Sequence, residues 1–465
     1  MFQQIKVRSE YTFREVYGPL DKILAATQGA VGLCDKNSTW GHVAFSKVCK
    51  EAGRKALLGV ELSVVEDAGK KEKQGTNQMS FLACNDAGLK EIYELLSLAT
   101  DANHFYYIPR IDYSTLFDVS DNVVMLSGAF PVWGNLPKRK NLFVELSPIS
   151  QPKAIEVARE RKLQIVATSD NYYPRISDRK VYEIIAGQNR QTRTSPMHLL
   201  SVADWRMIFS GVPDVALKNQ QLIVDMCDAH LPQAKMPKFT GLPTIEDMCR
   251  KASKSRGIDL KNKVYNDRLK REIALIKEKD FDDYFYMVSD IITYAKQHML
   301  VGPARGSSCG SLVCYLLGIT DIDPIPYDLL FERFIDINRK DLPDIDIDFA
   351  DDRRDMVFAY VANKYGESCV ARLGTIMRYK AKSTITDVAK ELGIPAWEVK
   401  DFKDSIVERS TGDARANFCI MDTFEQLEIG KRTLEKYPQM RVAAHIENHA
   451  RSSGQHAAGI VITAE

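Results

Sequence analysis

The first 235 residues alternate short apolar runs with amphipathic segments, and this alternation restricts the fold more than any other feature of the chain. Runs typical of β-strands occur at 30–34, 56–62, 122–128, 142–146 and 163–170. Segments with helical spacing lie between them, at 87–99 and 152–162. Strands that alternate with helices predict βα units and a mainly parallel sheet, either barrel-like or doubly wound. Asp35, Glu61 and Asp170 stand at or just past strand ends, where βα barrels place their chemistry.

The composition excludes several other classes of protein. The 465 residues carry a formal net charge of +1, with 45% hydrophobic and 27% charged residues, the mix of an ordinary globular protein of about three domains. The 9 cysteines form no CxxC pair, so neither a zinc ribbon nor a thioredoxin-type site is expected. We expect a cytoplasmic protein, because the start of the chain lacks a signal-peptide pattern and no run approaches the ~20 apolar residues of a membrane span.

The second half of the chain begins with a linker and a basic stretch. Residues 231–244 are rich in proline and poor in periodicity, which is typical of a linker. Residues 250–279 contain eleven Lys or Arg and four Asp or Glu, a local net charge of +7. Such a stretch is either a solvated helix face or a contact for a phosphate backbone. Residues 380–450 have mostly helical patterns.

The motif Pro343-Asp344-Ile345-Asp346-Ile347-Asp348 carries the clearest chemistry. On a β-strand, alternate residues share one face, so the three carboxylates would project together while the isoleucines anchor the other face. Adjacent negative charges need cations to neutralise them, and hard oxygen ligands suit Mg²⁺. Two such ions would promote phosphoryl transfer. The alternative is a solvated acidic edge strand.

A glycine- and serine-rich loop precedes this motif by about forty residues. The sequence 301–319, VGPARGSSCGSLVCYLLGI, leads from glycines into an apolar helix. A turn of this kind at a helix N-terminus offers backbone N–H groups to a phosphate. Arg305 would add a bidentate donor, and the hydroxyls of Ser307, Ser308 and Ser311 would add more. A phosphate loop ahead of a metal-binding strand is the layout of a nucleotidyl transferase.

These two stretches resemble the palm of the C-family bacterial and bacteriophage replicative DNA polymerases. Weaker similarity extends over essentially the whole chain, including GQHAAGIVI near its end. The resemblance implies an α/β fold: a distorted βα barrel, the polymerase-and-histidinol-phosphatase (PHP) domain, then a nucleotidyltransferase-type palm and a helical thumb. The implied domains are the PHP-like domain at 1–235, the palm at 236–378, the thumb at 379–450 and the beginning of a second palm segment at 451–465.

The resemblance also implies the roles of individual residues. Asp346 and Asp348 would ligate two catalytic Mg²⁺ ions, with Asp344 as a supporting acid. The family's Gly-Arg-Gly-Ser phosphate loop corresponds to Ala304, Arg305, Gly306 and Ser307, so its first glycine is replaced here. Lys382 would contact nucleotide or template phosphate. The expected partners are primer–template DNA and dNTPs, with no membrane.

The PHP-like domain departs from the family's metal-binding pattern. Its His-x-His position reads Lys6-Val7-Arg8, a later histidine position falls near Gln78, and the closing Asp-x-His reads Asp170-Asn171-Tyr172. Lysine and arginine do not ligate cations at neutral pH, but they would form salt bridges with Asp35, Glu61 and Asp170. We therefore expect a metal-free, structural barrel without nuclease activity.

The chain stops before the position of the family's third catalytic aspartate. This implies a requirement for a C-terminal fragment that carries that aspartate and the fingers, and that would also contact the sliding clamp. Without it, the isolated chain is expected to be inactive. Two other interpretations stay open: a non-catalytic scaffold that binds DNA or the replisome, and a PHP-type phosphoesterase, which would need the missing histidines.

Overall fold

The protein is described by a computed structural model that covers residues 2–212, 214–233, 235–303, 305–336, 338, 343–409, 413 and 415–464. It divides into two compact units. The first joins Met1–Pro232 with Ile376–Gly454, and the second joins Gln233–Thr375 with Gln455–Glu465. The coil that follows residue 226 contains the predicted linker and the first division. The predicted limits of the PHP-like domain, palm and thumb stay a prediction. The two units are defined by packing, which does not test where these functional domains begin and end.

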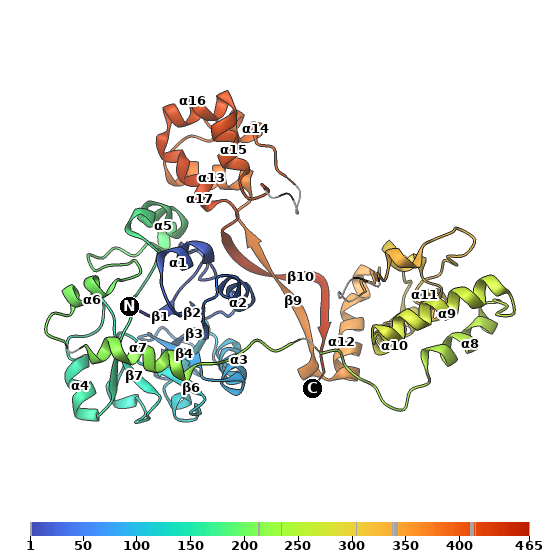
Figure 1. Cartoon of the computed structure of the whole chain (residues 1–465), viewed down its shortest axis with the longest axis horizontal. Coiled ribbons are helices and arrows are strands. Elements are labelled where there is room, and N and C mark those ends of the chain that lie inside the picture. The colour runs from blue at the N-terminus through green and yellow to red at the C-terminus, as the bar shows by residue number, and fades with distance from the viewer. Residues whose placement is uncertain are drawn as a thin grey trace. The chain divides into compact units, whose positions relative to one another are not determined.

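A curled sheet forms the centre of the first unit (Figure 1). Its strands are β1 (Gln4–Val7), β2 (Val31–Lys36), β3 (Ala56–Val65), β4 (Asn77–Ala83), β5 (Arg110–Asp112), β6 (Val123–Leu126), β7 (Leu142–Leu146) and β8 (Gln164–Ala167). The order is β1-β2-β3-β4-β6-β7-β8, with β5 paired to β3. The pairings are parallel except where β4 runs against β3 and β6. This confirms the predicted mainly parallel, barrel-like α/β fold.

Side chains connect β1 and β8, the two edge strands of this sheet. Among the described residues these two strands do not pair with each other through backbone hydrogen bonds. Buried Gln220 accepts from the backbone N–H of Gln3 and donates to the carbonyl of Ala167. Beside it, the Ser169 hydroxyl donates to Gln4, and the Asn171 side chain bonds both the N–H and the carbonyl of Arg8. The start of β1 and the end of β8 are thereby held together, so the sheet behaves as a distorted barrel.

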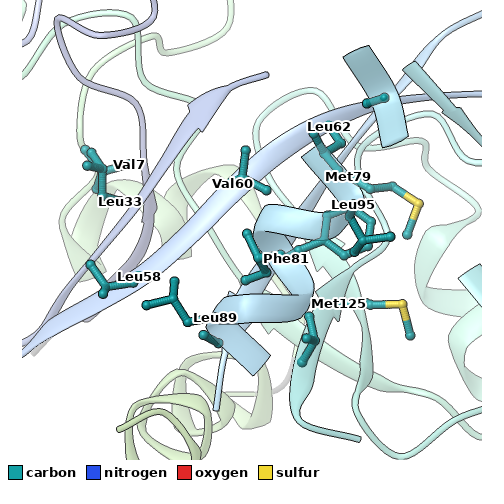
Figure 2. Packing of buried hydrophobic residues seen from close by; sticks show 14 of the residues in the cluster. Val7, Leu33, Leu58, Val60, Leu62, Met79, Phe81, Leu89, Leu95 and Met125 are labelled. Carbon is teal, nitrogen blue, oxygen red and sulfur yellow. The ribbon is translucent and has the colours of Figure 1, made fainter. Parts of the chain in front are cut away.

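Helices cover both faces of the sheet. Those from the N-terminal part are α1 (Leu20–Ala26), α2 (His42–Glu51), α3 (Asp86–Thr100), α4 (Ala154–Arg161), α5 (Arg179–Ala186), α6 (Val202–Ile208) and α7 (Val215–Met226). Figure 2 shows Leu89 and Leu95 of α3 beside Phe81 and Met125 of the sheet. Leu82, which follows Phe81 in β4, belongs to a second cluster with Ile223 of α7. Adjacent residues face opposite sides, as β-strand geometry requires.

The predicted thumb segment is helical and packs within the first unit. Its helices are α13 (Ala381–Glu391), α14 (Lys400–Ser405), α15 (Cys419–Gln426), α16 (Glu428–Lys436) and α17 (Ala443–Ile446). Their buried face shares one core with α5, in which Ile385 and Phe402 join Tyr182 and Ile185. Burial of this face, rather than helix propensity alone, stabilises such short helices.

The second unit is mostly helical. It contains α8 (Ile245–Ser255), α9 (Lys263–Glu278), α10 (Asp282–His298), α11 (Leu312–Leu316) and α12 (Arg354–Tyr365). Strands β9 (Val370–Arg378) and β10 (Ala450–Ile462) pair with each other, and each carries residues of both units. Among the described helices, none has the length and apolar character needed to cross a membrane.

Candidate active site

The acidic motif is extended but does not form the predicted ladder strand. Over 343–348 the described backbone makes no strand pairing, and the segment ends in a single bridge between Phe349 and Val301. The predicted alternation holds, since Asp344, Asp346 and Asp348 are exposed while the isoleucines between them are half-buried. Anchoring the isoleucines requires only an extended backbone, whereas a ladder requires a neighbouring strand. The strand assignment is corrected, and the shared acidic face is retained.

Contacts with the core of the second unit hold the motif in place. Ile345 and Ile347 pack against the cluster that contains Phe285 and Leu316. The backbone of Ile345 hydrogen-bonds the Tyr284 hydroxyl, whose pKa is raised chiefly by burial. The N–H of Gly302 donates to the carbonyl of Asp348 at 2.9 Å. The aspartates therefore project from a backbone that is anchored on both sides of Asp346.

Arg305 connects the glycine-rich loop to two of the three aspartates. Its Nη2 lies 3.3 Å from an oxygen of Asp346, and its Nε lies 3.3 Å from an oxygen of Asp348. Gly306 follows with φ +71°, and a Cβ built on it would lie 3.4 Å from Asp346. The Cβ would make an ordinary contact, so it is the left-handed backbone that favours glycine. Ser307 is exposed beside it, while Ala304 lies outside the described residues.

The predicted phosphate site at the start of α11 is filled by a side chain of the protein. Buried Glu272 accepts hydrogen bonds from the N–H groups of Leu312 and Val313 and from the Ser311 hydroxyl, at 2.9–3.0 Å. The Ser308 hydroxyl donates to the carbonyl of Arg305. A carboxylate at a helix N-terminus satisfies the groups that a phosphate would otherwise use. Ser308 and Ser311 are thus structural, and the exposed candidates are Arg305, Gly306 and Ser307.

Glu272 and its partner Arg268 were missed by sequence reasoning. Arg268 contacts Glu272 at 2.5 Å and donates to the carbonyls of Gly310 and Leu329. Burial raises the pKa of Glu272, and the hydrogen bonds it accepts oppose that effect. Within the sequence both residues belong to the basic stretch, where a charged side chain is most often solvated. Only an apolar pattern around Glu272, with Leu269, Ile273 and Ile276 on the same helix face, hinted at its burial.

Lys382 lies in the first unit, on the first turn of α13. Its side chain is exposed, and its backbone N–H donates to Glu408 at 3.4 Å. The aspartates and the glycine-rich loop belong to the second unit. The predicted contact of Lys382 with phosphate stays a prediction.

Buried ion pairs fill the interior of the barrel-like sheet. Lys6 Nζ lies 2.9 Å from both Glu61 and Glu145. Arg8 binds Glu61 through Nε at 2.7 Å and Asp170 through Nη1 at 2.6 Å. Burial alone would raise the pKa of Glu61, but Arg8 and Lys6 outweigh it and hold that pKa at about 2. The predicted salt bridges of Lys6 and Arg8 with Glu61 and Asp170 are confirmed.

Two members of this network, and one exception to it, were not foreseen. Arg193 meets the second oxygen of Asp170 at 2.6 Å, and Glu145 of β7 pairs with Lys6. Asp35 instead accepts from the Ser9 N–H, the Ser9 hydroxyl and the Thr12 hydroxyl, and burial raises its pKa to about 6. No Lys or Arg ion pair reaches Asp35 within the described part of the chain, so that part of the expectation is wrong. Three cations thus face three carboxylates: Lys6, Arg8 and Arg193 against Glu61, Glu145 and Asp170.

Comparison with known proteins matches these two regions separately. Residues 7–179 match the PHP domain family, and residues 243–465 match the family described as the bacterial DNA polymerase III alpha NTPase domain. Proteins named DNA polymerase III subunit alpha are 29% identical in Borreliella burgdorferi and 30% identical in Treponema pallidum, each over 99% of this chain. The one from Aquifex aeolicus is 28% identical over 93% of the chain.

The chain belongs to the DNA polymerase III alpha family. It covers 45% of the Borreliella protein and 44% of the Treponema protein, so it spans less than half the length of these relatives. Nearly all of the barrel-like sheet lies in the region that matches the PHP domain. Nearly all of the second unit lies in the region that matches the polymerase III alpha NTPase domain. The acidic motif and the Arg305 loop both lie in that region.

Proposed function

We propose that this chain provides the acidic and phosphate-binding parts of a nucleotidyl transfer site that extends a DNA primer from dNTPs. The observation that carries the proposal is the convergence of Asp346 and Asp348 on the single guanidinium of Arg305. Carboxylates and an arginine gathered at one point are the groups that bind a metal–triphosphate complex. Family membership supports the same activity.

The donor set fits a hard divalent cation. Asp346 and Asp348 are 44% and 59% exposed and already surround one cationic group, so both can offer oxygen ligands, and Mg²⁺ prefers such ligands with retained waters. The described residues contain no group of three or more His, Cys, Asp or Glu arranged to hold a metal. We propose Asp344 as a supporting acid on the family resemblance. When bound, Mg²⁺ would lower the pKa of the primer hydroxyl and neutralise charge on the phosphates.

The other groups of the site would position the substrate. Arg305 has a planar fork that matches phosphate oxygens, and Gly306 and Ser307 expose their backbone and hydroxyl beside it. Lys382 would contact nucleotide or template phosphate as a point charge. Because the chain spans less than half of its relatives, we propose that a complementary segment supplies the third aspartate, the fingers and any contact with the sliding clamp.

The PHP domain is proposed to be structural and metal-free. The Lys6, Arg8 and Arg193 cations neutralise the acids that a metal cluster would need, so the residues present do not fit such a cluster. Metal analysis of the purified chain checks this, since ions retained at the barrel would contradict it.

Primer extension tests the proposed activity. The chain would be assayed alone, with its C-terminal complement, and in the mixture with Asp346→Ala or, as a matched control, Asp352→Ala, an exposed acid outside the alternating motif. We expect extension by the mixture that Asp346→Ala abolishes and Asp352→Ala preserves. Extension that survives Asp346→Ala would contradict the assigned site, and DNA binding without extension in any mixture would favour the scaffold interpretation.

A further inference from the structure

One edge of the Arg305 guanidinium lies between Asp346 and Asp348. The Nε–Nη2 edge meets both carboxylates, at 3.3 Å each, rather than forming a bidentate pair with one of them. The side chain is 55% exposed, so it has room to leave. Among the residues that the structure describes, the one positive charge of Arg305 thus faces the two negative charges of Asp346 and Asp348.

The backbone that carries the carboxylates is held by contacts that do not involve Arg305. The Gly302 N–H holds the Asp348 carbonyl, and a Cβ added to Gly302 would lie only 2.9 Å from the Cβ of Asp348. Ile345 and Ile347 are packed in the core of the unit. Arg305 itself has an extended backbone, with φ −148° and ψ 148°, next to the left-handed Gly306. The anchored partners are therefore the acids, and the mobile partner is the long arginine side chain, which has several rotatable bonds.

We propose that Arg305 is an internal counter-ion that competes with the divalent metal for Asp346 and Asp348 and is released to the nucleotide phosphates when the metal binds. The proposal rests on the proposed function, because it concerns the regulation of the same site. A divalent ion supplies two positive charges at the point where the guanidinium supplies one. The displaced guanidinium then lies beside Gly306 and Ser307, where phosphate oxygens are its natural partners.

This competition couples two binding events. A metal that displaces Arg305 frees it for an anion, and an anion that takes up Arg305 opens the carboxylates to the metal. Such coupling is reciprocal by thermodynamic linkage. In the absence of nucleotide, the site would hold metal weakly, and metal and nucleotide would enter together.

Titration of the full chain with Mn²⁺ alone, followed by electron paramagnetic resonance of the free ion, tests the proposal without any catalytic readout. The Asp346→Asn/Asp348→Asn double variant defines the ions bound elsewhere. We expect Arg305→Gln to bind Mn²⁺ at this site about 3- to 10-fold more tightly than the unmodified chain, the range that two half-exposed ion pairs permit. Arg305→Lys keeps the charge but loses the second nitrogen donor. Its Mn²⁺ affinity should fall between that of Arg305→Gln and that of the unmodified chain.

Arg250→Gln is the matched control, because Arg250 is 50% exposed and pairs with Glu246 on α8 rather than with the motif. Its Mn²⁺ affinity should be unchanged. Equal or weaker binding by Arg305→Gln, or an equal gain in Arg250→Gln, would overturn the proposal while leaving the metal site intact. If the double aspartate variant bound as many ions as the unmodified chain, the metal site itself, and with it the proposed function, would be wrong.

Discussion

Arg8 donates to both carboxylate oxygens of Glu61, from Nε at 2.7 Å and from Nη2 at 2.8 Å, and both side chains are buried. The remaining nitrogen, Nη1, contacts Asp170 at 2.6 Å. One guanidinium therefore joins β3 to the residues that follow β8. Because these acids have cationic partners inside the barrel, their charges are compensated by the protein itself.

Removal of Arg8 should destabilise the PHP domain strongly. Arg8→Met leaves Asp170 with Arg193 and Glu61 with Lys6 as their remaining cationic partners, so two buried acids each lose one ion pair. Loss of one partner from a buried pair costs about 3–5 kcal/mol. Urea unfolding of the full chain, followed by a probe in the first unit, measures this. Lys36→Met removes an ion pair with Glu15 that is only partly buried and should cost no more than about 1 kcal/mol. Equal effects of the two variants would contradict the importance of burial.

The sequence allowed the salt bridges of Lys6 and Arg8 to be predicted, because cations stood where ligands were expected and acids were available. The contributions of Arg193 and Glu145 could not be predicted in the same way. Arg193 lies after the last strand of the barrel-like sheet. Its ion pair with Asp170 depends on the path of a loop. Asp35 differs for a local reason: the turn at 9–12 brings a backbone N–H and two hydroxyls to its carboxylate, so no cation is required.

His42 should make stability depend on pH. Its ring is buried, with Nε2 2.8 Å from the Gly59 carbonyl, to which it donates, and Nδ1 3.2 Å from the Tyr93 hydroxyl. Burial lowers the pKa of His42 to about 4, so the unfolded chain binds more protons between pH 4 and its ordinary value of 6.5. This contribution is complete above pH 6.5 and is lost as the pH falls through 4, by about 3 kcal/mol in total.

The pH dependence of unfolding in His42→Gln measures that contribution. The decline in stability between pH 6.5 and 4 should be shallower than in the unmodified chain, and part of it should remain, since burial also lowers the pKa of His449 to about 4. His230→Gln serves as the control because that side chain is 73% exposed. An unchanged slope in His42→Gln would refute the assignment.

Glu272 should be essential to the shape of the glycine-rich loop. Glu272→Ala leaves the N–H groups of Leu312 and Val313 buried without their partner and leaves Arg268 without its carboxylate partner, which should cost at least about 3 kcal/mol. Thermal unfolding of the second unit measures the loss. Glu278→Ala, an exposed change on the same helix, should shift the midpoint little. If Glu272→Ala shifted the unfolding midpoint as little as the control does, the cap would be dispensable.

The candidate site was predictable in part because its chemistry lies within two short stretches. The alternation at 344–348 correctly predicted which side chains are exposed, since burying Ile345 and Ile347 on an extended backbone suffices for it. It did not reveal whether a neighbouring strand completes a ladder, which depends on residues far away in the chain. The helix at 312–316 was also foreseen, but its N-terminus is occupied by Glu272, forty residues earlier, and local patterns carry no information about such a long-range cap.

Gly302 should tolerate no side chain, because it sets the position of Asp348. A Cβ on Gly302 would lie 2.9 Å from the Cβ of Asp348, closer than carbon atoms normally approach, and the first carbon of a side chain has no freedom to move aside. Gly302→Ala should therefore displace Asp348 and reduce both Mn²⁺ binding and primer extension in the complemented mixture by at least about 10-fold, the effect of a misplacement near 1 Å. Gly134→Ala, which meets no atom within 4 Å, should leave both unchanged. Full metal binding by a folded Gly302→Ala chain would show that Asp348 does not need this close approach.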